Sequence, residues 1–160
     1  MSNKLIRTIA ATLGFIVLAI LDAAAPRAET GAESAAIAAA NHVFDRALSA
    51  RDIAAMDTIW AHEPDVIAVH PASKAPIVGW AAVRKSWEAT FDRFADISVS
   101  MQDPQIRIKG NVAWVVGLEE VRGKLKNGET AVFTALTTNM FENTGGRWLM
   151  VVHTTSRVPQ

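Results

Sequence analysis

The sequence predicts an α+β domain in which three N-terminal helices pack on a curved, mainly antiparallel sheet of four to six strands. Residues 34–94 contain three segments whose apolar residues recur at helical spacing. Beyond Ala95, apolar and polar residues alternate as they do in strands, and three turn sequences containing glycine divide this half into four long strands. Four strands joined in this way form an antiparallel meander.

The helices and the two short strands follow in order along the first half. The first helix is expected over residues 34–50, and Asp52 is suited to cap a second helix that ends near Trp60. Residues 66–69 and 77–78 are expected to form short strands. Gly79 then opens the third helix, whose apolar side chains lie three or four residues apart. These side chains are Trp80, Val83, Trp87, Phe91 and Phe94.

The long strands are expected near residues 97–108, 112–124, 129–142 and 147–158, and Pro104 implies a bend or an edge position in the first of them. Residues 112–118 and 132–136 are apolar on both faces of their strands, whereas a sheet with one wet face would alternate cleanly. The helices can cover only one face. We therefore expect a homodimer through the other face of the sheet.

Residues 1–28 have the pattern of a secretory signal peptide. Lys4 and Arg7 precede an apolar stretch over residues 9–21, and small alanines follow. The stretch is short for a membrane span, which needs about 20 apolar residues. We therefore expect a periplasmic or secreted protein, with an uncleaved N-terminal membrane anchor as the alternative. The chain has no cysteine, so no disulfide supports the exported domain.

Composition argues against several function classes. The formal net charge is zero and no long run of lysine or arginine occurs, so we expect no nucleic-acid partner. The histidines lack the paired spacing of metal-binding motifs, so we expect no metal and no cofactor, although a metal site assembled by the tertiary structure stays open. The four histidines are His42, His62, His70 and His153.

Several short motifs, taken in order, carry a family resemblance. They are Phe44, Asp52 and Trp60, then Val69-His70-Pro71, Gly79-Trp80 and Trp87, and finally Arg147-Trp148, His153 and Ser156. Together they resemble the SnoaL-like branch of the nuclear transport factor 2-like superfamily. The resemblance implies a cone-shaped α+β barrel and a SnoaL-like domain over residues 29–160.

The resemblance also extends to the ketosteroid isomerases, which use a tyrosine on the first helix and an aspartate before a proline. Phe44 stands at the position of the tyrosine, and this chain has no tyrosine. His70 stands at the position of the aspartate, and Thr154 stands where the family often has a further histidine. Steroid isomerase chemistry in its usual form is therefore not expected.

His70 is the candidate catalytic residue, because an imidazole with a pKa near about 6.5 suits a general acid or base. Its alternative role is a structural hydrogen bond in the pocket wall. Asp45, Glu119 and Glu120 are expected to be solvated, and at most one of the two glutamates should reach the interior. The candidate ligand contacts, each with core packing as the alternative, are Phe44, Trp60, Trp80, Trp87, Trp114 and His153.

These features favour an exported SnoaL-like protein with a pocket, lined by tryptophan, for a small apolar or aromatic molecule. One hypothesis gives this pocket acid/base chemistry of the isomerase or cyclase kind. The alternatives are a non-catalytic ligand-binding module and a dimerising interaction domain, because one fold serves many functions.

Overall fold

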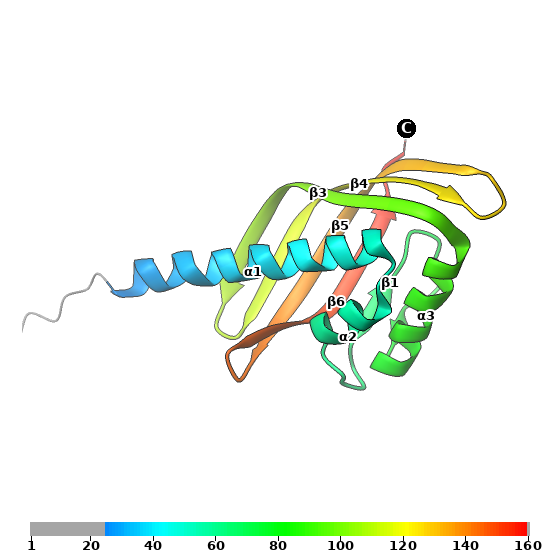
Figure 1. Ribbon diagram of the computed structural model, residues 1–160. Coiled ribbons are helices and arrows are strands. Elements are labelled where there is room, and N and C mark those ends of the chain that lie inside the picture. The colour runs from blue at the N-terminus through cyan, green and yellow to red at the C-terminus, as the bar shows by residue number, and fades with distance from the viewer. Residues whose placement is uncertain (1–24, 160) are drawn as a thin grey trace, which may run out of the picture.

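In the computed structural model, which describes residues 25–159, six strands form one sheet in the order β2-β1-β6-β5-β4-β3 (Figure 1). The α+β class and the mainly antiparallel sheet are as predicted. The elements are α1 (Ala25–Ala50), α2 (Ile53–Ile59), β1 (Ile67–Val69), β2 (Ile77–Val78), α3 (Trp80–Arg93), β3 (Phe94–Lys109), β4 (Val112–Leu125), β5 (Thr130–Thr144) and β6 (Arg147–Arg157).

The long strands β3 to β6 form the expected antiparallel meander, and the short strand β1 joins it by pairing parallel to β6. The connecting turns contain glycines with positive φ, a conformation that glycine adopts without steric cost, at Gly110, Gly128 and Gly145-Gly146. The parallel pair aligns Ala68 with His153. This pairing brings the chain after β1 next to the final strand.

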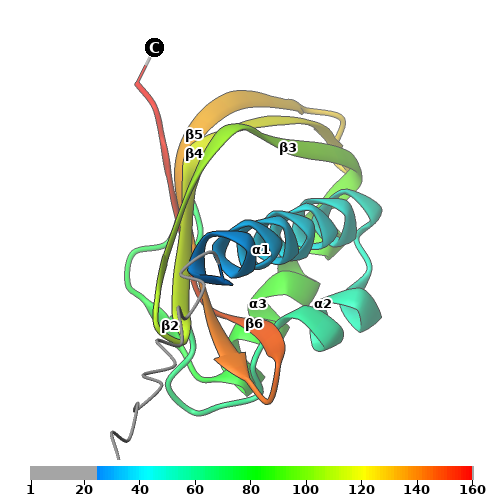
Figure 2. The same ribbon diagram turned by 90° about the vertical axis from the view of Figure 1, so that its left-hand side faces the viewer.

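The three helices cover the concave face of the sheet (Figure 2). The sheet curves around α1, while α2 and α3 close its open side. The second helix begins as predicted, because the Asp52 side chain accepts a hydrogen bond of 3.0 Å from the backbone N–H of Ala55.

Helix α1 begins at Ala25, so the predicted start at residue 34 was wrong. The first fully buried side chain described in this helix is that of Ile37. Residues before it lie beyond the edge of the sheet (Figure 1), so they carry no apolar periodicity that could have indicated a helix. Pro26 is tolerated there because the first turn of a helix needs no N–H donor.

Strand β3 continues through the predicted interruption at Pro104. Its pairing with β4 shifts register between Gln102 and Gln105, and Asp103 adopts a φ of 44°. The strand lies at the edge of the sheet, where a residue without an N–H group costs no ladder hydrogen bond. The proline is therefore accommodated by a bulge in an edge strand.

A second bulge changes which side chains of β6 face inward. Met140 pairs with Val152 and Phe141 pairs with Met150, so Val151 has no partner in the ladder. Strict alternation along β6 would place Met150 on the face opposite His153, and the bulge reverses this. Both side chains are buried on the concave side.

The outer face of the sheet keeps the apolar character that its sequence predicted. Leu118 and Leu136 are paired across β4 and β5 and are 45% and 51% exposed. Trp114, Val116 and Met140 continue the same face and are half-buried. The described part of the chain offers no element that covers these side chains.

The predicted signal segment, residues 1–28, lies outside the described residues except for its last four, which open α1. Among the described helices, none combines the length and the apolar character needed to span a membrane.

Candidate functional site

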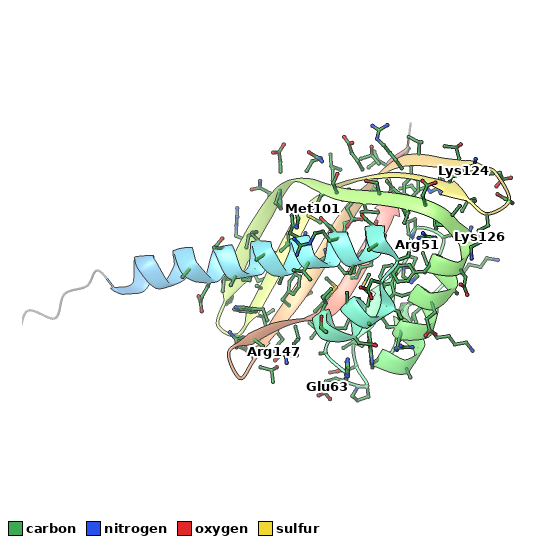
Figure 3. The ribbon with its side chains drawn as sticks, viewed as in Figure 1. Arg51, Glu63, Met101, Lys124, Lys126 and Arg147 are labelled. Atoms are coloured by element: carbon green, nitrogen blue, oxygen red, sulfur yellow. The ribbon has the colours of Figure 1, made fainter. Side chains whose placement is uncertain are left out.

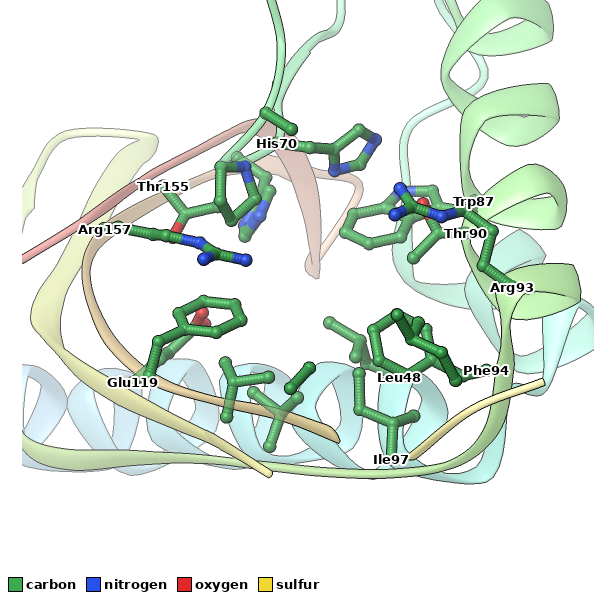
Figure 4. Close-up of a pocket in the computed structure, with 18 residues that line it drawn as sticks. Leu48, His70, Trp87, Thr90, Arg93, Phe94, Ile97, Glu119, Thr155 and Arg157 are labelled. Atoms are coloured by element: carbon green, nitrogen blue, oxygen red, sulfur yellow. The ribbon is translucent and has the colours of Figure 1, made fainter. Parts of the chain in front are cut away.

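A cavity of about 160 Å³ lies between α3 and the concave face of the sheet. Its walls come from β3 to β6, from the end of α1 and from the segment that follows β1 (Figure 4). Trp87, Glu119 and His153 are almost fully buried and form its deep part. Arg93 and Arg157 are exposed and lie at its mouth. The cavity is thus apolar for most of its surface, with a few polar groups at defined depths.

His70 follows β1 and is held by α3. Its Nε2 lies 2.8 Å from the Ser86 hydroxyl, and that hydroxyl donates its single proton to the carbonyl oxygen of Val83 at 2.6 Å. The imidazole must therefore donate from Nε2, which leaves the lone pair on Nδ1. In Figure 4 the ring projects toward the cavity from its upper edge. His70 consequently presents an unprotonated nitrogen beside the cavity.

Burial keeps the His70 ring neutral. Desolvation lowers the pKa of His70 to about 4, because the charged form loses its hydration. The ring packs edge-on against Trp87, with 4.3 Å between the ring centroids. A backbone hydrogen bond of 2.9 Å from its own N–H to the Ser73 hydroxyl fixes the turn that carries it. His70 is thus a rigidly placed, neutral base.

His153 belongs to a buried chain of amides. Its Nδ1 lies 2.7 Å from Oδ1 of Asn139, whose Nδ2 donates to Oδ1 of Asn41 at 2.7 Å. Since Asn139 Oδ1 can only accept, His153 donates from Nδ1 and keeps its lone pair on Nε2. Desolvation, and then the nearby His70, lower the pKa of His153 to about 3. The two imidazoles lie 6.2 Å apart between centroids, and both are neutral.

Glu119 is the acidic group of the cavity. It is 3% exposed, and its Oε1 has no hydrogen-bond partner among the described residues. Desolvation raises the pKa of Glu119 to about 7; the charge of Asp45 adds to the rise, and a hydrogen bond from Thr137 opposes it. At neutral pH this carboxyl is therefore partly protonated.

The expectation that Asp45 and Glu119 are solvated was wrong, because α1 and the curved sheet enclose both. Asp45 accepts a hydrogen bond of 3.2 Å from the backbone N–H of Met101. Burial raises the pKa of Asp45 to about 6, although that hydrogen bond opposes the rise. Glu120 is exposed, so one of the two adjacent glutamates reaches the interior, within the limit predicted from strand alternation.

Replacing Glu119 with glutamine is expected to change how stability depends on pH. Between pH 4.5 and 7 the folded protein holds a proton on Glu119 that the unfolded chain releases, so stability falls as the pH rises through this window. Over that range the free energy of unfolding of Glu119→Gln should gain up to about 3 kcal/mol relative to the unmodified protein. Urea unfolding at several pH values measures the difference.

The neighbouring Glu120→Gln is the control and should show no such gain. His70 and His153 contribute with the opposite sign, since their lowered pKa values make stability fall as the pH drops below 6.5. Both variants retain these histidines, so their contribution cancels in the comparison. A constant difference at all pH values would contradict the raised pKa of Glu119.

Three of the predicted site residues, His70, Trp87 and His153, line the cavity. Phe44 lies behind it, with its ring centroid 5.6 Å from that of Trp87 and 5.1 Å from that of His153. Phe44 therefore supports the wall of the cavity rather than forming part of its surface.

The other three tryptophans predicted as ligand contacts lie elsewhere. Trp60 stacks on Trp80 at 6.1 Å, and Trp80 in turn stacks on His62 at 4.8 Å, away from the cavity lining. Trp114 is on the outer face of the sheet, opposite the buried Ala113 and Val115. The predicted ligand contacts of these tryptophans do not apply to this cavity.

The sequence interpretation did not select Glu119, Thr155 or the two arginines. A signal for part of this group was present, because His153, Thr155 and Arg157 are two residues apart in one strand and share a face. Arg93 and Glu119 come from other elements, and only the closed sheet brings them to the same cavity. Within residues 25–159, no group of three histidine, cysteine or acidic side chains is arranged to hold a metal ion.

Solved structures share this architecture. A provisionally assigned dehydratase of the NTF2-like family from Streptomyces avermitilis is 21% identical, with a TM-score of 0.74 over 82% of this chain and 99% of that one. An NTF2-like superfamily protein from Salmonella enterica is 16% identical, with a TM-score of 0.76 over 82% and 94%. A provisionally assigned calcium/calmodulin-dependent protein kinase type II association domain from Thiobacillus denitrificans is 25% identical, with a TM-score of 0.64 over 76% and 94%.

The sequence comparison is more specific than these structural ones. No curated protein shows a significant match to the chain. The family model of the SnoaL-like domain, however, matches residues 37–160, which is most of the chain and includes every residue of the cavity. The chain, with its helices packed in a curved NTF2-like sheet, therefore belongs to the SnoaL-like domain family.

Proposed function

We propose that this protein binds a small aromatic molecule in the cavity beside Trp87 and transfers a proton within it. The observation that carries the proposal is the combination of groups in one cavity. His70 presents a neutral nitrogen, and Glu119 is a carboxyl with a pKa near neutrality. A base and an acid held in different environments are the usual requirement for acid/base catalysis at neutral pH.

In the proposed reaction the ligand carries a carbonyl group. His70 Nδ1 takes a proton from the carbon next to the carbonyl, the C–H electron pair forms a new C=C bond, and the carbonyl oxygen receives the displaced pair. Protonated Glu119 donates a hydrogen bond or its proton to that oxygen. The imidazolium then returns its proton to a carbon of the same system, so atoms and charge balance without an additional reactant.

The low pKa of His70 restricts the substrates. A base with a pKa of about 4 is weak, so it removes protons only from strongly activated carbons. A carbon flanked by a carbonyl and an aromatic ring is of this kind. The aromatic lining of the cavity suits the ring, since such pockets are mostly apolar with a few placed polar groups.

Phenylacetone provides the test, because its benzylic protons lie between a ring and a carbonyl. Proton NMR in D₂O should show that the protein exchanges these protons faster than buffer alone. His70→Ala and Glu119→Gln should each lower the rate by at least about 100-fold, the usual contribution of a general acid or base. His62→Ala, which changes an exposed histidine outside the cavity, should exchange at the unmodified rate.

A parallel thermal shift assay separates binding from catalysis. Ligand at 100 times its dissociation constant should stabilise the fold by about 2.7 kcal/mol. If phenylacetone binds but its protons exchange no faster than in buffer, the result would contradict proton transfer and support a non-catalytic ligand-binding module. If a panel of single-ring aromatic compounds produces no shift, both forms of the proposal fail.

Dimer formation through the outer face of the sheet is our second proposal. The exposed, directly paired Leu118 and Leu136 favour it, because contiguous apolar surface of this kind marks interaction sites. The Thiobacillus denitrificans relative, described as an association domain, is compatible with an interaction role. Multi-angle light scattering at micromolar concentration should give a dimer mass, and Leu118→Glu combined with Leu136→Glu should give a monomer.

The control for the dimer is Val78→Glu, which introduces one glutamate at an exposed valine of β2, the strand at one edge of the sheet. It should remain dimeric. A monomer mass for the unmodified protein would contradict the proposal.

Export by residues 1–28 is also a proposal. Mass spectrometry of the protein recovered after expression of the full chain should show the loss of about this segment. An intact N-terminus on membrane-bound protein would favour the uncleaved anchor instead.

A further inference from the structure

Two guanidinium groups face each other across the mouth of the cavity. Arg93 ends α3, Arg157 ends β6, and Figure 4 shows their side chains reaching toward the opening from opposite sides. Neither forms an ion pair with a carboxylate of the described residues, whereas Arg84 and Arg122 do. The mouth therefore carries two cations without an acidic partner inside the described part of the protein.

Arg157 is held in place by an aromatic ring. Its guanidinium carbon lies 4.1 Å above the centroid of the Phe133 ring, and Phe133 also lines the cavity. A cation over a ring face is attracted to it, and the N–H groups at the edge of the guanidinium remain free to bind an acceptor. The interaction therefore holds Arg157 at the wall without using its hydrogen-bond donors.

No acidic side chain of residues 25–159 lines the mouth itself. Glu119 is the one carboxylic acid among the described residues that line the cavity, and it lies in the deep part, away from the mouth. Figure 3 shows Arg51, Lys124 and Lys126 at the same end of the molecule, although Lys126 lies 4.0 Å from Asp92 and Lys124 is paired across the sheet with Asp96. Clustered cations at the entrance of an apolar cavity attract anions.

We propose that the ligand is an aromatic compound whose ring occupies the apolar interior and which carries, besides the reacting carbonyl group, a carboxylate that lies between Arg93 and Arg157. The volume fits one ring, since an apolar cavity of about 150 Å³ is known to hold benzene. Guanidinium groups bind carboxylates through paired, charge-assisted hydrogen bonds. This inference rests on the proposed function, because it names the substrate class of the same cavity.

The test compares phenylacetate with phenylacetamide, two ligands of nearly the same size that differ in charge. Isothermal titration calorimetry should show that the unmodified protein binds phenylacetate at least about tenfold more tightly. Arg93→Gln combined with Arg157→Gln should remove this preference and leave the affinity for phenylacetamide unchanged. Arg122→Gln, an exposed arginine of β4 outside the cavity, should retain the preference.

The salt dependence of binding tests the same proposal without any substitution. Raising the NaCl concentration should weaken the binding of phenylacetate and have little effect on phenylacetamide, because only the charged ligand is screened. Equal affinities that respond equally to salt would overturn the anion site while leaving the proposed aromatic pocket intact. If neither compound binds the unmodified protein, the aromatic pocket fails, and the anion site fails with it.

Discussion

Replacing Trp87 with alanine is expected to lower the free energy of unfolding by about 4 kcal/mol. The side chain is 2% exposed, and its ring packs against the rings of Phe44, His70, Phe91 and His153. Alanine would remove these contacts and leave a void that adjoins the existing cavity. The surrounding side chains could not fill this enlarged void, so little of the lost packing would be recovered. Urea unfolding followed by far-UV circular dichroism at pH 7 measures the loss.

Trp87→Phe is the matched control. Phenylalanine keeps most of the packed ring, and it removes the indole Nε1–H, which has no acceptor among the described residues. Its cost should therefore be well below that of alanine, at about 1–2 kcal/mol. An alanine variant that loses less than about 1 kcal/mol would show that this ring is not part of the packed core.

Replacing Asn139 with leucine is expected to cost a similar amount for a different reason. Leucine has nearly the same shape but leaves the Nδ1–H of His153 and the Oδ1 of Asn41 buried without partners. Each orphaned group costs about 1–3 kcal/mol, so the total should be about 2–6 kcal/mol. Nitrogen-15 NMR of the imidazole should also show that His153 no longer holds the Nδ1–H tautomer alone.

A double-mutant cycle distinguishes this explanation from lost packing. Asn41→Leu combined with Asn139→Leu removes one of the two orphaned groups, so the pair should cost less than the sum of the single substitutions. Additive costs would mean that the amide chain contributes nothing as a unit. Thr138→Val, a half-buried change on the opposite face of the same strand, should preserve the tautomer of His153.

The elements that were predicted well are those whose own sequence shows a clear pattern of apolar or turn residues. Helix α3 shows one apolar stripe, which the structure buries at Val83, Trp87 and Phe91. The turns of the meander contain the glycines that positive φ requires, so their positions could be read directly. Local residue preference and tertiary structure agree in these segments, and little else was needed to predict them.

Strand β4 shows why the pocket was harder to predict. Both of its faces are apolar, so its pattern did not decide which face lines the pocket, and Trp114 was a candidate ligand contact. Ala113 and Val115 are fully buried on the concave side that α1 covers, so Trp114, which lies between them, faces outward. Which face of β4 lies inside is set by the helix that covers it, and the sequence of the strand alone does not show this.

The prediction that the acidic side chains of Asp45 and Glu119 are solvated was wrong for a related reason. Carboxylates are rarely buried, so solvent exposure was the reasonable expectation for Glu119 and Asp45. Strand alternation nevertheless put Glu119 on the same face as the buried Val115 and Val121. For Glu119, strand alternation was therefore a better guide to burial than the polarity of the side chain. Such disagreement between local preference and fold is typical of functional sites.

The parallel pairing of β1 with β6 also determines when the cavity can form during synthesis. Strand β1 has Val152 and Thr154 as its partners on β6, near the end of the chain. The ribosome adds roughly 5–20 residues per second, so β1 is made several seconds before those partners exist. Until β6 emerges, the strand that precedes His70 lacks one of its two neighbours, and the cavity lacks His153, Thr155 and Arg157. A nascent chain that stalls before β6 therefore exposes the edge of β1 opposite β2 and has no complete cavity.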